Sequence, residues 1–142
     1  MEDKINEIRE QMEKTRNEYM SKIDSLREEY NSRMSELEGQ GLSYGEMGLD
    51  PEIQRLDNEM TTLSDELTGV LNDLENQLSL AEDKANRISD INAQIQNRMS
   101  ELEAQGISYG EMYMDPEVIR LNEEIDSIIN EVTKEEQEKN DA

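Results

Sequence analysis

The side chains that could do chemistry in this sequence are almost all carboxylates. The chain of 142 residues has 36 Asp and Glu against 14 Lys and Arg, and it contains no His and no Cys. A chain without imidazole and thiol groups lacks the commonest general base, the most reactive nucleophile and the ligands of most zinc sites. We therefore expect a protein that is not an enzyme, with no catalytic residue, no cofactor and no disulfide bond.

Carboxylates by themselves give little reason to expect catalysis or metal binding. A pair such as Asp65-Glu66 would transfer protons efficiently only in an apolar pocket that raises one pKa, and the pattern around it is that of an exposed helix face. Glu135-Glu136 could hold calcium weakly, but the chain has neither the calcium-binding loop nor a Glu-x-x-His pair. Gly39-Gln40-Gly41 lacks the Lys and the hydroxyl residue of a phosphate loop. We expect no tight metal site and no nucleotide site.

An internal repeat is the most informative pattern in the sequence. Residues 33–60 align with residues 98–125 at an offset of 65 residues, and 19 of the 28 paired positions are identical. Each copy is typical of a helix end, a loop and a helix start. Asp50 and Asp115 each precede Pro-Glu, so we expect them to be helix N-caps. We expect Gly39, or Gly106 in the second copy, to supply the left-handed residue that ends the preceding helix.

Apolar residues at helical spacing predict three long helices. Their approximate ranges are 3–38, 51–103 and 116–138, followed by a frayed tail at 139–142. The first stripe repeats every 11 residues, whereas the second opens with heptads that include Leu67, Val70 and Leu74 and shifts phase near Leu78. Narrow apolar stripes among polar residues are typical of coiled coils.

These elements predict an all-α protein that forms a single elongated helical domain over residues 1–142. Because Gly-containing loops reverse the chain, we expect long antiparallel helical hairpins built from two copies of a helix–loop–helix repeat. Leu, Ile and Val number 28 of the 142 residues, which is too few for a globular core. The number is enough for a seam, the narrow apolar contact between two packed helices. Two-helix seams bury little surface, so we also predict a homo-oligomer.

The two loops, 39–50 and 104–115, carry apolar side chains that a plain helical turn does not need. In the first loop these are Leu42, Tyr44, Met47 and Leu49. In the second they are Ile107, Tyr109, Met112, Tyr113 and Met114. The interpretation we favour is that they cap the open end of each hairpin, because an exposed apolar cluster promotes aggregation. The alternative is that they dock a partner, since Tyr and Met are common contact residues, and both roles can hold at once.

The formal net charge of −22 restricts the class of partner. Nucleic acids and anionic membranes carry the same sign, so we expect no direct binding to either and a protein partner that is basic or offers apolar pockets to the loops. The chain has no apolar run long enough to span a bilayer, and its first residues, MEDKINEIRE, do not resemble a signal peptide. We expect a cytoplasmic protein, or one internal to a virion.

The combined pattern favours a non-enzymatic acidic coiled-coil protein that mediates protein–protein interaction as a rod-like adaptor or assembly scaffold. Scaffolding proteins of virus assembly share this acidic, helical and cysteine-free character, which is an association of class and not a shared motif. The alternative is a DNA-mimic inhibitor that occupies the nucleic-acid site of a basic host protein. Against mimicry, residues 1–38 hold seven basic side chains and a net charge of only −4.

Overall fold

The computed structural model describes residues 2–141, and it describes the side chains of residues 2–134. Its elements are α1 (Glu2–Gly39), α2 (Tyr44–Met47), α3 (Pro51–Ala104), α4 (Tyr109–Met112) and α5 (Pro116–Asp141). The described residues contain no strand, so the predicted all-α class is confirmed. The last helix continues to Asp141, beyond the expected end near residue 138. Fraying of the tail 139–142 stays a prediction, because Ala142 and the side chains of residues 135–141 lie outside the part of the chain that the structure describes.

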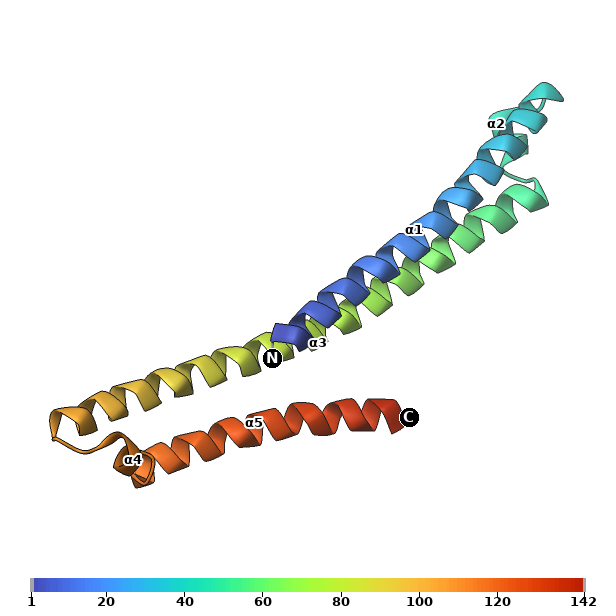
Figure 1. The fold of residues 1–142 in the computed structure, drawn as a ribbon. Helices are drawn as coiled ribbons and strands as arrows, with labels where there is room; N and C mark the ends of the chain where they lie inside the picture. Colours follow the sequence, from blue (N-terminus) through green and yellow to red (C-terminus); the bar gives the residue numbers. More distant parts are fainter. Residues whose placement is uncertain (1, 142) are drawn as a thin grey trace. The chain divides into compact units, whose positions relative to one another are not determined.

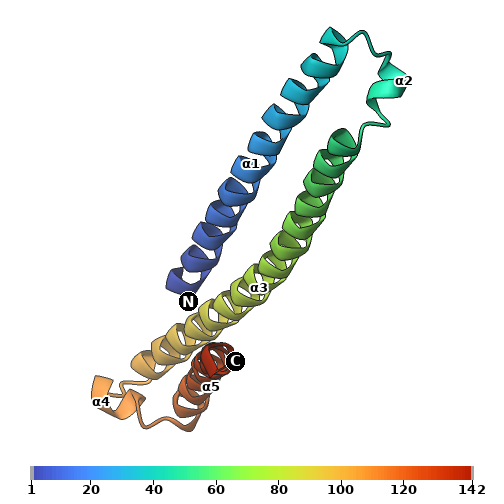
Figure 2. The ribbon, with the colours of Figure 1, turned by 90° about the vertical axis from the view of Figure 1, so that its right-hand side faces the viewer.

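The chain divides into two compact units that share the continuous helix α3. The N-terminal unit is Asn6–Leu78, and the C-terminal unit is Ser79–Ala142 together with Met1–Ile5. In the N-terminal unit, α1 lies beside the first part of α3, and the chain reverses direction through α2 (Figures 1 and 2). In the C-terminal unit, α5 lies beside the last part of α3, and the chain reverses through α4 (Figures 1 and 2). The single domain expected from the sequence stays a prediction.

A left-handed glycine ends the first helix of each unit. Gly41 has a φ of 83° and Gly106 a φ of 84°, and the two lie at the repeat offset. In the first copy the N–H of Gly41 donates to Glu38 O and the N–H of Leu42 donates to Leu37 O, the paired bonds of a Schellman cap. The expectation for Gly106 is therefore confirmed. The expectation for Gly39 is wrong, because Gly39 is still part of α1.

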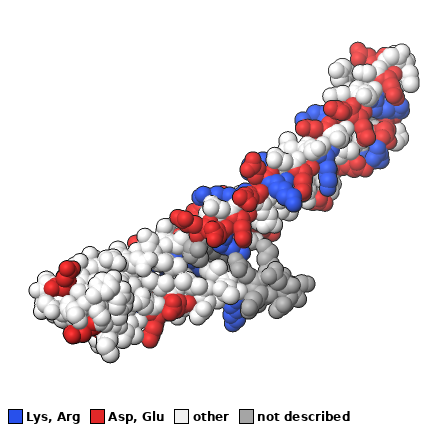
Figure 3. Space-filling view, viewed as in Figure 1, with Lys and Arg blue, Asp and Glu red and all other residues white. Residues whose placement is uncertain are grey.

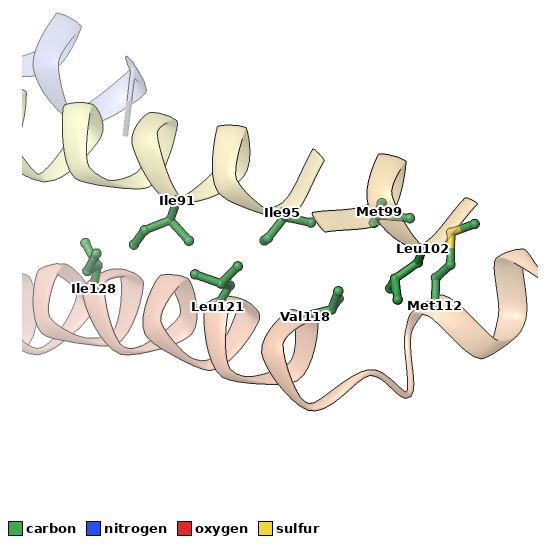
Figure 4. Close-up of a cluster of buried hydrophobic side chains, with 8 residues drawn as sticks. All are labelled: Ile91, Ile95, Met99, Leu102, Met112, Val118, Leu121 and Ile128. Atoms are coloured by element: carbon green, nitrogen blue, oxygen red, sulfur yellow. The ribbon is translucent and has the colours of Figure 1, made fainter. Parts of the chain in front are cut away.

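Each unit has its own apolar core between two helices. In the C-terminal unit, α3, the loop and α5 contribute facing side chains to one cluster (Figure 4). Its buried members are Ile91, Ile95, Met99, Leu102, Met112, Val118, Leu121 and Ile128. In the N-terminal unit, a cluster at the loop end contains buried Leu37, Met47 and Ile53, with Tyr30, Met34 and Leu42 packed against it. Both clusters reach into the loops, so loop residues take part in holding each pair of helices together.

The apolar stripe of α3 changes phase earlier than the spacing predicted. Val70 is 37% exposed although the heptads place it inward. Leu71 is half-buried instead, between the buried Leu67 and Leu74. The change of phase expected near Leu78 therefore begins around Leu71, because a step of four residues replaces the step of three after Leu67.

Candidate functional site

An arginine clamp holds the start of the second helix in each unit. Arg33 donates from Nε to Asp50 Oδ2 at 3.1 Å and from Nη2 to Oδ1 at 2.8 Å. Arg98 makes the same two bonds to Asp115, both at 3.0 Å. Both aspartate side chains are only 12% exposed. A bidentate guanidinium–carboxylate pair fixes orientation as well as distance, so it sets where the chain re-enters the helix.

The same carboxylates cap the helices that follow. Asp50 Oδ2 accepts from the N–H of Ile53 at 3.1 Å, and Asp115 Oδ2 accepts from the N–H of Val118 at 3.3 Å. The hydrogen bonds from Arg33 and Arg98 lower the pKa of the two aspartates below the ordinary value, although partial burial acts in the opposite direction. Both side chains therefore stay charged at neutral pH and hold the arginine and the helix N-terminus together.

Reasoning from the sequence found the two caps but missed their arginine partners. Arg33 and Arg98 also donate to Glu36 at 3.1 Å and to Glu101 at 3.2 Å, one turn further along the same helix. A signal for them was present, since Arg33 and Arg98 are the first residues of the two repeat copies. Retention of an arginine 17 positions before each capping aspartate points to a contact between the two.

Two of the nine apolar loop residues lie in the cores. Met47 is buried in the cluster of Leu37 and Ile53, and Met112 is buried in the cluster that contains Leu102. Leu42 and Ile107 are half-buried and pack against the same two clusters. These four side chains close the loop end of each seam, the position that a capping role requires.

The other five apolar loop residues are exposed. They are Tyr44, Leu49, Tyr109, Tyr113 and Met114, with exposed fractions from 50% for Tyr113 to 83% for Tyr44. Large apolar side chains with this exposure contribute little to the cores, so capping does not account for them. Each loop thus combines a buried methionine with exposed side chains available for contact, and the docking role of the exposed set stays a prediction.

The N-terminal loop, residues 40–50, is tied down by local polar contacts. Ser43 Oγ accepts from the N–H of Glu46 at 3.3 Å and donates to Glu46 Oε1 at 3.0 Å. Gln54 Nε2 donates to the carbonyl of Gly48 at 3.3 Å. These bonds occupy polar groups of the loop with partners from the chain itself.

The C-terminal loop, residues 105–115, uses aromatic contacts in place of those bonds. Ser108 makes no side-chain cap hydrogen bond to α4. The rings of Tyr109 and Tyr113 meet edge to face, with centroids 5.3 Å apart and an interplanar angle of 75°. The hydroxyl of Tyr113 donates to that of Tyr109 at 3.1 Å, and this bond raises the pKa of Tyr113. The two loops therefore share a backbone plan but present different surfaces.

Charges are mixed along the N-terminal unit and sparse beside α4. Lys and Arg lie among Asp and Glu over α1 and the first part of α3, whereas the surface over α4 that faces the viewer shows uncharged and acidic residues (Figure 3). Arg55 pairs with Glu52 and Glu59 on α3, and Arg120 makes an equivalent pair of contacts on α5. Local pairing therefore neutralises part of the acidic surface.

The described residues contain no group of three or more His, Cys, Asp or Glu side chains that could hold a metal ion. The side chains of Glu135-Glu136, which we considered for weak calcium binding, lie outside the described set. Among the described helices, none has both the length and the apolar character needed to cross a bilayer.

Comparison of the chain with protein-family models, with curated proteins and with solved structures finds no match.

Proposed function

We propose that the chain is a non-enzymatic adaptor or assembly scaffold that binds protein partners through its two loops. The observation that carries this proposal is the exposure of Tyr44 and Leu49 in one loop and of Tyr109, Tyr113 and Met114 in the other. Tyrosine and methionine are well suited to contact, because one offers a large rigid surface and the other adapts its shape. These side chains contribute little to the two apolar cores of the folded chain.

The architecture we propose is a rod of two antiparallel coiled-coil hairpins, each a copy of one repeat. Recurrence of the Arg–Asp clamp and of the left-handed glycine at the repeat offset supports the repeat. Helix α3 has 54 residues, or roughly 80 Å of helix axis. A chain that carries two docking loops suits the bridging of two partner molecules, which raises overall affinity through effective concentration.

We also propose that the chain associates with itself. Each unit is held by apolar contacts between two helices, and a two-helix seam buries little surface. Half-buried residues such as Tyr19 and Met60 would gain burial from another copy. Sedimentation of a folded monomer at micromolar concentration would contradict this part of the proposal.

The partner we propose is a protein with a basic surface or with apolar pockets that accept the loop side chains. The net charge of −22 favours encounter with basic proteins and disfavours nucleic acid and anionic lipid. Cytoplasm, or the interior of a virion, is the compartment we propose, because the absence of cysteine suits a reducing environment.

The second candidate is an inhibitor that mimics DNA, and the net charge of −22 is the observation in its favour. A mimic presents carboxylates in place of phosphates, yet several carboxylates near the loops are already paired with arginine. Asp50 and Asp115 are held by Arg33 and Arg98, and Glu52 is held by Arg55. The mixed charges over α1 also weaken this alternative (Figure 3).

Site-specific photo-crosslinking tests the adaptor against the mimic. A photoreactive phenylalanine analogue replaces Leu49 or Met114, and the control replaces Asn72, which is exposed on α3. The adaptor predicts that one partner protein crosslinks at both loops and not at residue 72, with little change as salt is raised. Mimicry predicts capture along the acidic faces, including residue 72, with a steep loss at high salt.

A further inference from the structure

We infer that the two loops are unequal and that the C-terminal loop is the primary docking site, for a basic partner segment with an apolar anchor. This inference rests on the proposed docking function and goes beyond it by ranking the two loops and naming the chemistry of the segment. It starts from the positions at which the otherwise similar loops differ in sequence.

Three substitutions enlarge the apolar surface of the C-terminal loop. At equivalent positions the first copy has Gly48, Leu49 and Gln54, and the second copy has Tyr113, Met114 and Ile119. Ile119 stands at the position of Gln54, whose side chain donates to the carbonyl of Gly48 in the first copy. We call Tyr109, Tyr113, Met114 and Ile119 the C-terminal patch, and all four are at least 42% exposed. In the first copy only Tyr44 and Leu49 are exposed apolar side chains.

The aromatic part of this patch is held in place before any partner arrives. Tyr109 and Tyr113 are fixed against each other by the edge-to-face contact at 5.3 Å and by their hydroxyl hydrogen bond. In the first copy the position equivalent to Tyr113 is Gly48, so Tyr44 lacks this ring contact. Since ordering of side chains opposes binding, a pre-ordered pair of rings loses less entropy than a single mobile ring. The C-terminal patch is therefore both larger and better organised.

The charge next to the patch selects a cationic partner. Glu111 is exposed within α4, and Ser108 before it makes no side-chain cap hydrogen bond, whereas in the first copy Ser43 donates to the carboxylate of the equivalent Glu46. A lysine or arginine of the partner can pair with Glu111, and it can also lie over a tyrosine ring. The recognised segment thus combines an apolar anchor for the patch with a cation for Glu111.

A second copy of the chain fits this patch poorly. Residues 104–142 carry a net charge of −8, counted as 11 acidic and three basic residues. A symmetric contact between two C-terminal loops would bring like charges together, including both copies of Glu111. The self-association that we propose is therefore expected along the helices and not at this patch.

The test uses two synthetic peptides of about 14 residues with identical charge. The first is a helical peptide of lysine and leucine with leucine on one face, and the second has serine in place of every leucine. Each is titrated into the isotopically labelled full-length chain at physiological salt, and backbone amide shifts are followed at both loops. We expect saturable shifts over residues 109–119 at an affinity about tenfold tighter than over residues 44–54, with the leucine peptide only.

Exchange of the differing residues provides the matched variants. Y113G/M114L/I119Q converts the C-terminal loop to the first pattern, and G48Y/L49M/Q54I makes the reverse change. Gly48 has a φ of −64°, close to the −70° of Tyr113, and a Cβ there would meet no atom nearer than 3.6 Å, so the exchange is compatible with the fold. Y113G/M114L/I119Q should lose the tighter binding at the C-terminal loop, and G48Y/L49M/Q54I should gain it at the N-terminal loop. E111Q should weaken binding of the leucine peptide more than E46Q does.

The outcomes separate this inference from the proposed function. Saturable binding with equal affinity at both loops, or a preference that the exchanged residues fail to move, overturns the inference and leaves the adaptor proposal standing. Absence of saturable binding of the leucine peptide at either loop counts against both. Self-association that Y113G/M114L/I119Q abolishes, in place of peptide binding, would assign the patch to a second copy and overturn the inference.

Discussion

Arg33 donates hydrogen bonds to both carboxylate oxygens of Asp50, from Nε at 3.1 Å and from Nη2 at 2.8 Å, although the two residues are 17 positions apart in the sequence. Because Asp50 also caps α3 through the N–H of Ile53, a single carboxylate joins the end of one helix to the start of the next. The same arrangement recurs at Arg98 and Asp115. We regard this clamp as the device that gives each loop a defined shape, and it leads to the first two predictions.

Loss of the clamp should loosen the loop more than loss of an ordinary surface ion pair. Arg33→Ala leaves Asp50 without its bidentate partner, and we expect thermal unfolding followed by circular dichroism to shift down by roughly 5 °C. The matched control is Arg27→Ala, since Arg27 pairs with the exposed Asp24 one turn away on the same helix. The control should shift by less than about 1 °C. Equal shifts for the two variants would contradict a special role for the clamp.

The clamp should lose its contribution in acid. The pKa of Asp50 and Asp115 is lowered in the folded chain, so their contribution is present above the unfolded carboxyl pKa of 3.8 and disappears as pH falls through the lower folded value. We compare urea unfolding of the natural chain with that of D50N/D115N across pH. The difference in unfolding free energy should stay level above about pH 5 and vanish toward about pH 2. A difference that grows in acid would refute the assignment.

Gly39 and Gly41, near the end of α1, should respond in opposite ways to alanine. Gly41 has a left-handed backbone, so Gly41→Ala introduces strain and should destabilise the chain by about 1 kcal/mol. Gly39 lies in the helix, has open space at its Cβ position, and corresponds to Ala104 in the second copy. Gly39→Ala should therefore stabilise the chain by about 0.5 kcal/mol. Chemical denaturation measures both, and effects of the same sign would contradict the observed helix end.

Removal of a core side chain should have a much larger effect than removal of an exposed one. Leu56 is 1% exposed, and Leu56→Ala should lower the free energy of unfolding by about 3 kcal/mol. Leu80 is 59% exposed, so Leu80→Ala should stay within about 0.5 kcal/mol. A large loss at Leu80 would mean that another copy of the chain covers this residue in solution.

Much of the helical pattern is readable from the sequence because its signals are local. Asp-Pro-Glu marks the starts of α3 and α5, and both helices begin at the proline. Apolar spacing identifies the buried side of each helix, except where Val70 and Leu71 compete for one position. Val70 continues the heptads and Leu71 breaks them, yet Leu71 is half-buried and Val70 is 37% exposed, so spacing alone does not decide which of them turns inward.

The loops were harder to predict, for physical reasons. Irregular backbone has no period, so spacing could not separate the buried Met47 from the exposed Leu49 two residues later. The clamp was missed because it is a tertiary contact: the repeat retains both the arginine and the aspartate, but no local pattern joins two residues 17 positions apart. The short helices α2 and α4 lie within segments expected to be loops, since four residues are too few for a helical pattern to emerge.

The central claim is that the exposed loop side chains bind a partner. It is tested most directly by the double substitution Tyr44→Ser and Tyr109→Ser in the full chain, with far-ultraviolet circular dichroism and capture of the crosslinked partner measured on the same preparation. Both tyrosines are exposed, so we predict unchanged helicity together with loss of most of the captured partner. Undiminished capture by the variant, or loss of helicity in proportion to loss of capture, would contradict the claim.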